Sequence, residues 1–326
     1  MNNVISSRIR LARNFKDLPF SPKMKTENKE YLTDKIHQKV KADNRYNLNY
    51  IDMSKVTPVQ AGSMVEEHLI SLEFANNRQG KALLLSDDKK ISAMIGEEDH
   101  LRLQLFSNTD GIKELWEKAN EVDDWFDGLM PYAFSEELGY LTACPTNLGT
   151  GLRASVMLHL PALTESGYIE RFINASSKIG LTVRGMYGEG SAPNGAIYQL
   201  SNQITMGISE ADTIERLIQA AEKITQSEKE ISQELLKKDQ LKDRIARAEG
   251  ILRYSTLMSS AEFIKLFSDL RWGAEQGLNG LAPKALDELF LKVQPYNIML
   301  FGGEDLNGNE RDKKRAEILR QELKKL

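Results

Sequence analysis

Arginine side chains stand beside apolar segments or glycine-rich turns at several places in the sequence. Arg8 and Arg10 alternate with apolar residues, so an extended segment would point both to one side. Arg102 and Arg153 precede two further apolar runs, and Arg184 lies in a glycine-rich segment. An arginine side chain is a fixed fork of N–H donors that matches phosphate oxygens. These five arginines indicate a site for a nucleoside triphosphate. A solvated edge strand would equally explain Arg8 and Arg10 taken alone.

Acidic residues and the single cysteine indicate the second half of such a site. Glu97, Glu98 and Asp99 separate two apolar runs, Cys144 opens the turn CPTNLGTGLR, and Glu189 lies in the glycine-rich segment. A guanidinium is a poor nucleophile until carboxylates hold it and it loses a proton. A thiolate stabilised by nearby arginines could pair with it, so Cys144 would be a positioning anion and not a covalent nucleophile. An acidic turn and an inert buried cysteine are the alternatives.

Other classes of protein are disfavoured by what the sequence lacks. It has no GxxxxGK[ST] loop and no protein-kinase HRD or DFG set. The net charge of −4 is not the strong positive charge typical of nucleic-acid binders, and 4 His with 1 Cys, widely scattered, show no zinc spacing. One cysteine fits a reducing cytoplasm, and we expect neither a signal peptide nor a membrane span.

The apolar pattern predicts the elements that position these residues. Strands are expected at 48–53, 82–86, 91–95 and 154–160. Helices are expected at 26–44, 57–71, 110–126 and 168–179, and from Ser209 onward. Residues 181–202 are rich in glycine and predict a long loop that acts as a lid or a binding loop, with a plain irregular loop as the alternative.

A change of composition near residue 228 predicts two domains, at 1–228 and 229–326. The run 227–250 is highly charged and predicts a connector helix. The rest is expected to be helical, and its last helix would begin with Asn309 as N-cap.

Three segments carry a resemblance to a known family. CPTNLGTGLRASV resembles the signature of the guanidino (phosphagen) kinases, SSRIRLAR resembles their phosphate clamp, and GEEDHLR resembles their Asn-Glu-Glu-Asp-His motif. The resemblance implies an α+β fold, with an antiparallel β-sheet flanked by helices and a small all-helical C-terminal domain. It also implies ATP as substrate, Mg²⁺ carried by the ATP and no separate metal site.

The same resemblance assigns residues. It implies that Arg8, Arg10, Arg102 and Arg153 contact ATP phosphates, that Glu98 is the catalytic carboxylate and that Cys144 faces the guanidino group. His68 matches, more weakly, a family histidine near the nucleotide. The full set assigned to ATP is Ser6, Ser7, Arg8, Ile9, Arg10, His68, Arg102, Arg153, Ala154, Ser155, Val156, Met157, Arg184, Gly185, Met186, Tyr187 and Gly188.

A second acid is expected in the glycine-rich segment. Phosphagen kinases have Arg-Gly-x-x-x-Glu there, which matches Arg184 and Glu189. A gapless match from Ser201 and Asn202 would instead place Tyr187 at the arginine and Ala192 at the acid. We predict Glu189.

Two differences from the phosphagen kinases resemble the bacterial protein arginine kinases. The chain starts almost at the clamp, so the helical domain that closes over a small substrate is expected to be missing, and an extra helical region follows. The segment with Arg311, Asp312, Arg315 and Ala316 resembles that subfamily's phosphoarginine-binding motif. There, cations can hold the phosphoryl group while Asp312 holds the guanidinium. A solvated charged helix is the alternative.

The resemblance to that subfamily also implies a cellular role. The product would mark proteins for degradation by a Clp ATPase and protease (ClpC type) in the stress response. Further partners would be a zinc-binding activator protein (McsA type) and a heat-shock repressor (CtsR type), and the protein would be a homo-oligomer without a membrane contact. A free-arginine kinase and a non-catalytic phosphoarginine-binding adaptor are the alternatives.

Overall fold

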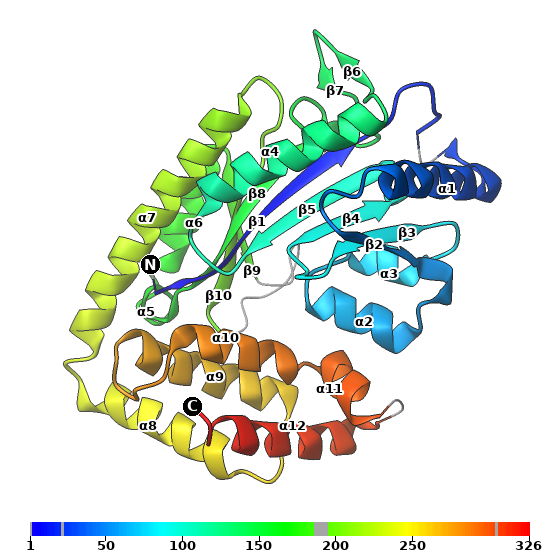
Figure 1. The fold of residues 1–326 in the computed structure, drawn as a ribbon. Coiled ribbons are helices and arrows are strands. Elements are labelled where there is room, and N and C mark those ends of the chain that lie inside the picture. The colour runs from blue at the N-terminus through cyan, green and yellow to red at the C-terminus, as the bar shows by residue number, and fades with distance from the viewer. Residues whose placement is uncertain (1, 21–22, 186–194, 304–305) are drawn as a thin grey trace. The chain divides into compact units, whose positions relative to one another are not determined.

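The computed structural model describes residues 2–20, 23–185, 195–303 and 306–326 (Figure 1). The strands are β1 (Val4–Arg13), β2 (Leu48–Asp52), β3 (Ala82–Ser86), β4 (Ile91–Ile95), β5 (Leu101–Ser107), β6 (Phe134–Ser135), β7 (Gly139–Tyr140), β8 (Leu152–His159), β9 (Leu181–Gly185) and β10 (Ile197–Asn202). The helices are α1 (Thr26–Ala42), α2 (Pro58–Glu66), α3 (Leu72–Asn76), α4 (Ile112–Leu129), α5 (Pro161–Glu165), α6 (Ile169–Lys178), α7 (Glu210–Leu235), α8 (Asp239–Tyr254), α9 (Ser260–Glu275), α10 (Pro283–Lys292), α11 (Pro295–Gly302) and α12 (Gly308–Glu322). The predicted α+β fold with an all-helical C-terminal region is confirmed.

Within the described ranges, one sheet has the strand order β2-β3-β4-β5-β1-β8-β10-β9. Strands β2 to β5 form an antiparallel meander, and β1 pairs antiparallel with β5. The N–H of Ala12 donates to the carbonyl of Gly151, and the N–H of His159 donates to the carbonyl of Asn3, so β1 and β8 are antiparallel too. Two arginine-bearing segments that are distant in sequence therefore lie on neighbouring strands.

The chain divides into two compact units. The sheet unit comprises Ser6–Val156 and Ser201–Ile218, and the helical unit comprises Met1–Ile5, Met157–Leu200 and Gln219–Leu326. The predicted boundary near residue 228 stays a prediction. Helix α7 continues across that position, so the change in composition there does not end an element.

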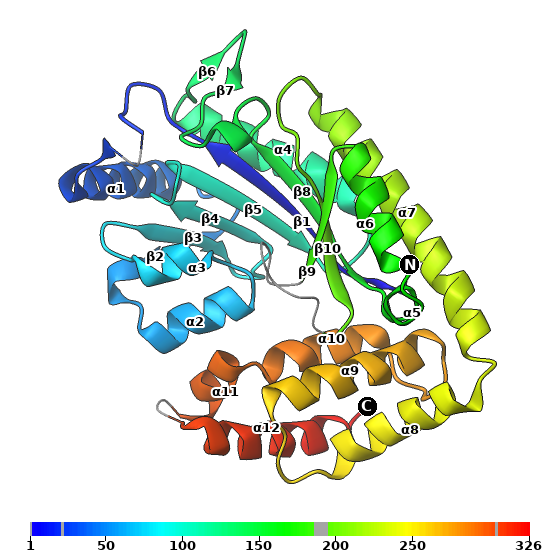
Figure 2. The same ribbon diagram turned by 180° about the vertical axis from the view of Figure 1, so that it is seen from behind.

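Helices cover both faces of the meander in the sheet unit. The side chains of Met53, Phe74, Leu83 and Met94 form a core between the strands and the helices α2 and α3, which lie beside β3 in both ribbon views (Figures 1 and 2). Helix α4 lies along β5 and buries an apolar stripe (Figure 1). This double cover explains why β3 and β4 are nearly continuous apolar runs.

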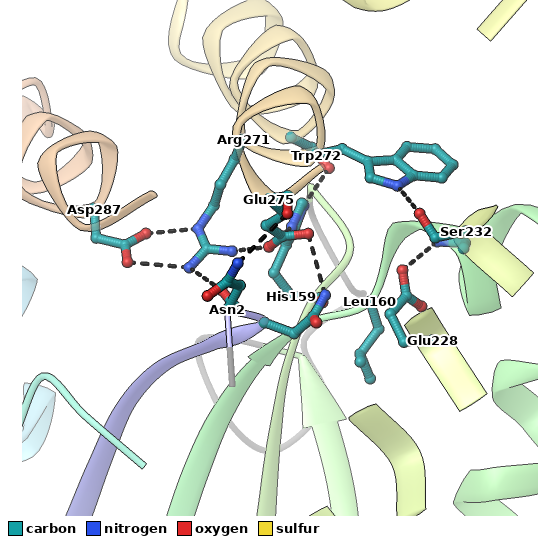
Figure 3. Close-up of polar contacts among 12 residues, drawn as sticks. Asn2, His159, Leu160, Glu228, Ser232, Arg271, Trp272, Glu275 and Asp287 are labelled. Atoms are coloured by element: carbon teal, nitrogen blue, oxygen red, sulfur yellow. Dashed lines mark hydrogen bonds and ion pairs between the residues drawn. The ribbon is translucent and has the colours of Figure 1, made fainter. Parts of the chain in front are cut away.

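A buried polar network joins strand ends to helices inside the helical unit (Figure 3). The guanidinium of Arg271 pairs with Glu275, and its Nε and Nη2 donate to Asp287 at 2.7 and 3.1 Å. Nδ1 of His159 lies 2.8 Å from Glu275 Oε1, and Asn3 donates to Glu275 Oε2 at 3.1 Å. Because buried charges need partners, this network holds the start of β1 and the end of β8 against α9.

Three predictions of local structure are wrong. Residues 181–202 are not one loop, since β9 and β10 form its two ends and residues 186–194 lie outside the described ranges. The charged run 227–250 is two helices, because α7 ends at Leu235 and α8 begins at Asp239. The N-cap of α12 is Asn307, which forms a capping box with Glu310 and so satisfies two end groups at once.

Candidate active site

Three arginine side chains project from one face of the sheet where β1 pairs with β5. Arg8 lies opposite Phe106, Arg10 opposite Gln104, and Ala12 opposite Arg102. Directly opposed residues share a face, and so do alternate residues along a strand. Arg8, Arg10 and Arg102 therefore share one face. The sequence predicted that Arg8 and Arg10 share a face, and the structure adds Arg102 from the neighbouring strand β5.

Positive charge is crowded on this face. Burial and the charge of Arg102 lower the pKa of Arg8 to about 10. The pKa of Arg10 lies well below its ordinary value because of burial and because of Arg8, Arg102 and Arg153 nearby. The Nε of Arg10 is buried with no hydrogen-bond partner among the residues that the structure describes. An unpaired buried donor among cations is costly, and a bound polyanion would satisfy it.

Glu97 is the counter-ion inside this cluster. Its Oε1 accepts from Arg102 Nη1 and from Ser71 Oγ, both at 2.6 Å. Burial raises the pKa of Glu97, but the charge of Arg102 and these hydrogen bonds outweigh burial, so the pKa is lowered. Glu97 therefore stays ionised and holds Arg102 in place.

Glu98, the neighbouring acid, points to a different partner. Its side chain is exposed, and hydrogen bonding with the nearby thiol of Cys144 acts to lower its pKa. Partial burial, with the charges of Asp99 and Glu97, raises the pKa of Glu98. The sulfur of Cys144 also lies 3.0 Å from the hydroxyl of Thr146. The structure thus brings together the two residues predicted for the acceptor side.

Asp99 fastens the acidic turn to the cysteine turn. Its buried Oδ1 accepts from the N–H of Ala143 and from Asn14 Nδ2, both at 2.6 Å. The amide oxygen of Asn14 accepts in turn from the N–H of His100 at 3.0 Å. Sequence reasoning missed the roles of Asp99 and Asn14. The only signal was an unusual run of three acids, of which Glu97 and Asp99 prove to be the inward ones.

The cysteine turn needs its glycines. Gly149 has φ +103, and a Cβ there would lie 2.3 Å from the carbonyl oxygen of Thr205. Gly151 has φ +60, and a Cβ there would lie 2.5 Å from Nη1 of Arg13. The side chain of Arg13 lies on the face of β1 opposite to Arg8 and Arg10. It stabilises the turn by donating to the carbonyl of Thr150 at 2.9 Å, and it pairs with Asp123.

The other residues predicted to contact ATP in these strands lie at various depths. The hydroxyl of Ser7 donates to the carbonyl of Thr109 at 2.7 Å, and that of Ser155 donates to the carbonyl of Arg8 at 3.5 Å. Ser6 is half-buried. Buried side chains, which leave only backbone groups for a ligand, are those of Ile9, Ala154, Val156 and Met157.

The predicted second acid lies outside the part of the chain that the structure describes. Arg184 and Gly185 end β9 in the helical unit. The residues beyond the described range are Met186, Tyr187, Gly188 and Glu189, together with the alternative Ala192.

His68 belongs to the arginine face. It follows α2 with φ 61, and the carbonyl of Leu69 accepts from Ser92 Oγ at 2.6 Å and from Gln104 Nε2 at 2.9 Å. Burial, together with the charges of Arg8 and Arg10, lowers the pKa of His68 to about 4. The imidazole is therefore neutral near pH 7 and offers a hydrogen bond without adding charge.

The lowered pKa of His68 predicts a pH effect. Above the ordinary value of 6.5 the imidazole is neutral in both folded and unfolded chains. As pH falls from 6.5 towards 4, the unfolded chain binds a proton that the folded protein does not, so folding stability is lost. In an NMR titration, with His68→Gln for assignment, we expect this ring to titrate near pH 4. Added ATP should raise that pKa, and titration near 6.5 in the free protein would contradict the assignment.

The predicted phosphoarginine motif lies on α12 in the helical unit. Arg315 is buried and donates to the carbonyls of Val293 at 3.0 Å and Met258 at 2.8 Å, and to Asp312 Oδ1 at 2.7 Å. The side chain of Asp312 is 33% exposed, whereas Ala316 is fully buried. Arg315 therefore fixes the orientation of the Asp312 carboxylate, and Asp312 is the more accessible of the two. The binding role of the motif stays a prediction.

Two family models match successive parts of the chain. Residues 30–231 match the family described as "ATP:guanido phosphotransferase, C-terminal catalytic domain". Residues 238–326 match "Protein-arginine kinase McsB C-terminal domain". A protein-arginine kinase of Caldanaerobacter subterraneus subsp. tengcongensis is 43% identical over 99% of this chain and 97% of its own length. Another, of Pelotomaculum thermopropionicum, is 40% identical over 99% of this chain and 93% of its own length.

Solved structures with a similar fold are phosphagen kinases. A lombricine kinase superimposes with a TM-score of 0.63 at 26% identity, over 70% of this chain and 66% of that one. A duplicated taurocyamine kinase from Schistosoma mansoni gives 0.62 at 26% identity, over 70% of this chain and 33% of that one. The chain thus spans only part of the length of these structures. Its relatives, the family matches and the fold agree, and the chain belongs to the ATP:guanido phosphotransferase family, among the protein-arginine kinases.

Proposed function

We propose that this kinase transfers the γ-phosphoryl group of ATP to a guanidino nitrogen of arginine residues in proteins. One observation carries the proposal. The bond between Asp99 and Ala143 fastens the turn of Glu98 to the turn of Cys144, in the same unit as the arginine face. Glu97, in the same turn as Glu98, pairs with Arg102, so anion-binding and guanidinium-binding groups are held close together, as transfer between two charged reactants requires.

The arginine face takes the triphosphate. Arg8, Arg10, Arg102 and Arg153 supply the donors that phosphoryl transfer uses to neutralise charge on the transferred group. Mg²⁺ carried by the nucleotide would neutralise further charge on the phosphates. Throughout 2–20, 23–185, 195–303 and 306–326, no group of three or more His, Cys, Asp or Glu side chains could hold a metal ion by itself. Mg²⁺ carried by the ATP stays the proposed ion.

Glu98 takes the proton. The substrate guanidinium lies between Glu98 and Cys144, loses one N–H proton to the carboxylate, and its nitrogen forms a bond to the γ-phosphorus as the bond to the β,γ-bridging oxygen breaks. ADP leaves with that oxygen, and the products are a phosphoarginine residue and a proton. The raised pKa of Glu98 suits it for accepting the proton. Glu189 stays the proposed second carboxylate.

The acceptor is tested by comparing free arginine with a protein. The protein is incubated with ATP and either free arginine or an unfolded protein, and products are identified by mass spectrometry under non-acidic conditions, because the P–N bond is acid-labile. We expect phosphoarginine in the protein. Turnover of free arginine alone would mean that the enzyme is a free-arginine kinase.

The thiol of Cys144 predicts a graded effect. Cys144→Ser keeps a hydrogen-bonding group beside Glu98 but removes the more easily ionised thiol. We expect a lower kcat/KM for the protein acceptor, with activity reduced but not abolished, and an unchanged KM for ATP. A thiol-modifying reagent should block the acceptor side in the original protein but not in Cys144→Ser. Abolished activity in Cys144→Ser would indicate an obligatory covalent role and contradict the proposal.

The C-terminal motif predicts a separate binding effect. Asp312→Ala removes a carboxylate that Arg315 holds in place, and losing a hydrogen bond to a charged group costs about 1.5–3 kcal/mol. We expect phosphoarginine to bind at least about tenfold more weakly by isothermal titration, on the same estimate. Lys313→Ala, exposed on the same helix, is the control. Unchanged affinity of Asp312→Ala for phosphoarginine would show that α12 is a solvated charged helix without a binding role, and it would exclude the adaptor role.

The proposed cellular role extends from the product. Phosphoarginine marks proteins for a Clp ATPase and protease of the ClpC type, and the kinase acts in protein quality control under stress. Its partners are a zinc-binding activator of the McsA type and a repressor of the CtsR type, and it works in the cytoplasm as a homo-oligomer. Residues 1–228 form the catalytic domain, and residues 229–326 form the domain that binds phosphoarginine. In the described residues no helix is long and apolar enough to cross a membrane.

A further inference from the structure

Two exposed apolar segments are fastened to the turn that carries Cys144. The first is the β6–β7 hairpin, which projects past the end of β1 in both ribbon views (Figures 1 and 2). Phe134 and Leu138 of this hairpin are 58% and 37% exposed. The second segment carries Ile204 and Met206, which are 47% and 49% exposed. We call these four residues the apolar rim.

Hydrogen bonds hold both segments on the cysteine turn. The N–H of Tyr140 donates to the carbonyl of Gly149 at 2.8 Å, and a Cβ on Gly139 would lie only 2.5 Å from that same oxygen. The hydroxyl of Thr205 donates to the carbonyls of Thr146 at 3.1 Å and Leu148 at 2.7 Å. The two segments of the rim are therefore fixed relative to the turn that carries Cys144.

We propose that the apolar rim binds the residues on either side of the target arginine in an unfolded protein segment. Large apolar side chains next to an arginine are mostly buried in folded proteins and become available when a protein unfolds. The hairpin tip adds two exposed acids, Glu136 and Glu137, whose charge complements a segment that contains arginine. The rim thus selects unfolded chains by their apolar flanks. This inference rests on the proposed function, because it places the target arginine at Glu98 and Cys144.

The test compares two short peptides with one arginine each. One has leucine and phenylalanine on both sides of the arginine, and the other has glycine and serine. We expect the original protein to phosphorylate the apolar peptide with a kcat/KM about tenfold higher, as burial of a few methylene groups permits. The triple variant Leu138→Ser, Ile204→Ser, Met206→Ser should lose this preference through KM, and the glycine–serine peptide should react as before.

Controls separate this result from other causes. Ile179→Ser removes a side chain of matched exposure, 48%, outside the rim and should keep the preference. If the triple variant does not fold, as judged by circular dichroism, Met206→Ser alone should still lower the ratio of kcat/KM between the apolar and the glycine–serine peptide.

An unchanged ratio of kcat/KM in a folded variant overturns the inference while the proposed function stands. Dissociation of an oligomer, with equal loss on both peptides, would overturn it by identifying a second copy of the chain as the occupant. Failure of the original protein to phosphorylate any peptide or protein overturns the proposed function itself.

Discussion

Glu98→Gln should lower kcat for protein-arginine phosphorylation by about 10²–10⁴-fold, the usual contribution of a positioned general base. The amide keeps the size of the carboxylate and can still hydrogen-bond with Cys144, but it cannot accept the guanidinium proton. ATP should bind with unchanged affinity, because Glu97 and not Glu98 pairs with Arg102. Single-turnover phosphorylation and nucleotide titration measure the two effects separately.

The pH profile gives an independent check on Glu98. Its pKa is raised by partial burial and by the neighbouring acids, so activity should rise with pH as Glu98 loses its proton, at a pH higher than for an ordinary glutamate. This rise should disappear in Glu98→Gln. Glu117→Gln, an exposed acid on α4, is the control and should keep both rate and profile. Normal phosphorylation by Glu98→Gln would exclude the proposed mechanism.

Arg271→Leu should lower the free energy of unfolding by about 3–5 kcal/mol, as expected when one partner of a buried ion pair is removed. The substitution leaves the carboxylates of Glu275 and Asp287 without their shared cation (Figure 3). Side chains of Arg271 and Glu275 are each only 1% exposed, so water cannot replace the lost partner. Urea unfolding followed by tryptophan fluorescence is suitable, because Trp272 is buried in the same helix.

A surface ion pair provides the matched comparison for Arg271. Arg247 pairs with Asp243 at 2.6 Å on α8, but its side chain is 75% exposed. Arg247→Leu should therefore leave the unfolding midpoint unchanged. Equal midpoints for Arg271→Leu and the original protein would show that the buried network does not support the helical unit.

Features that depend only on residues close together in the sequence were predicted from local patterns. The turn between β3 and β4 and the alternation of Arg8 with Arg10 follow from periodicity and turn residues alone. The chemistry of the residue types indicated an acceptor side with Glu98 and Cys144, and resemblance to a family assigned Glu98 as the catalytic carboxylate. A hydrogen bond such as that from Ala143 to Asp99 joins residues distant in sequence, and no local pattern reveals it.

The failures have physical reasons. The ends of 181–202 pair as β9 (LTVRG) and β10 (IYQLSN), whose β-branched and aromatic residues favour strands, and the glycines between them led to the prediction of one loop. The network of Arg271, Glu275 and His159 was not predicted, since charged residues in a sequence are normally read as exposed. Only tertiary packing makes them a buried cluster.

The crowded arginine face links the folding of this protein to its nucleotide supply. With no anion bound, Glu97 offsets only part of the repulsion among Arg8, Arg10, Arg102 and Arg153, and the remaining repulsion works against the folded sheet unit. A ligand that binds only the folded state adds stability by mass action, about 2.7 kcal/mol at a hundredfold excess over its dissociation constant. The melting temperature should therefore follow ATP concentration, so a cell depleted of ATP holds this kinase in its least stable form. The ATP concentration would then affect how long the enzyme stays folded as well as how fast it works.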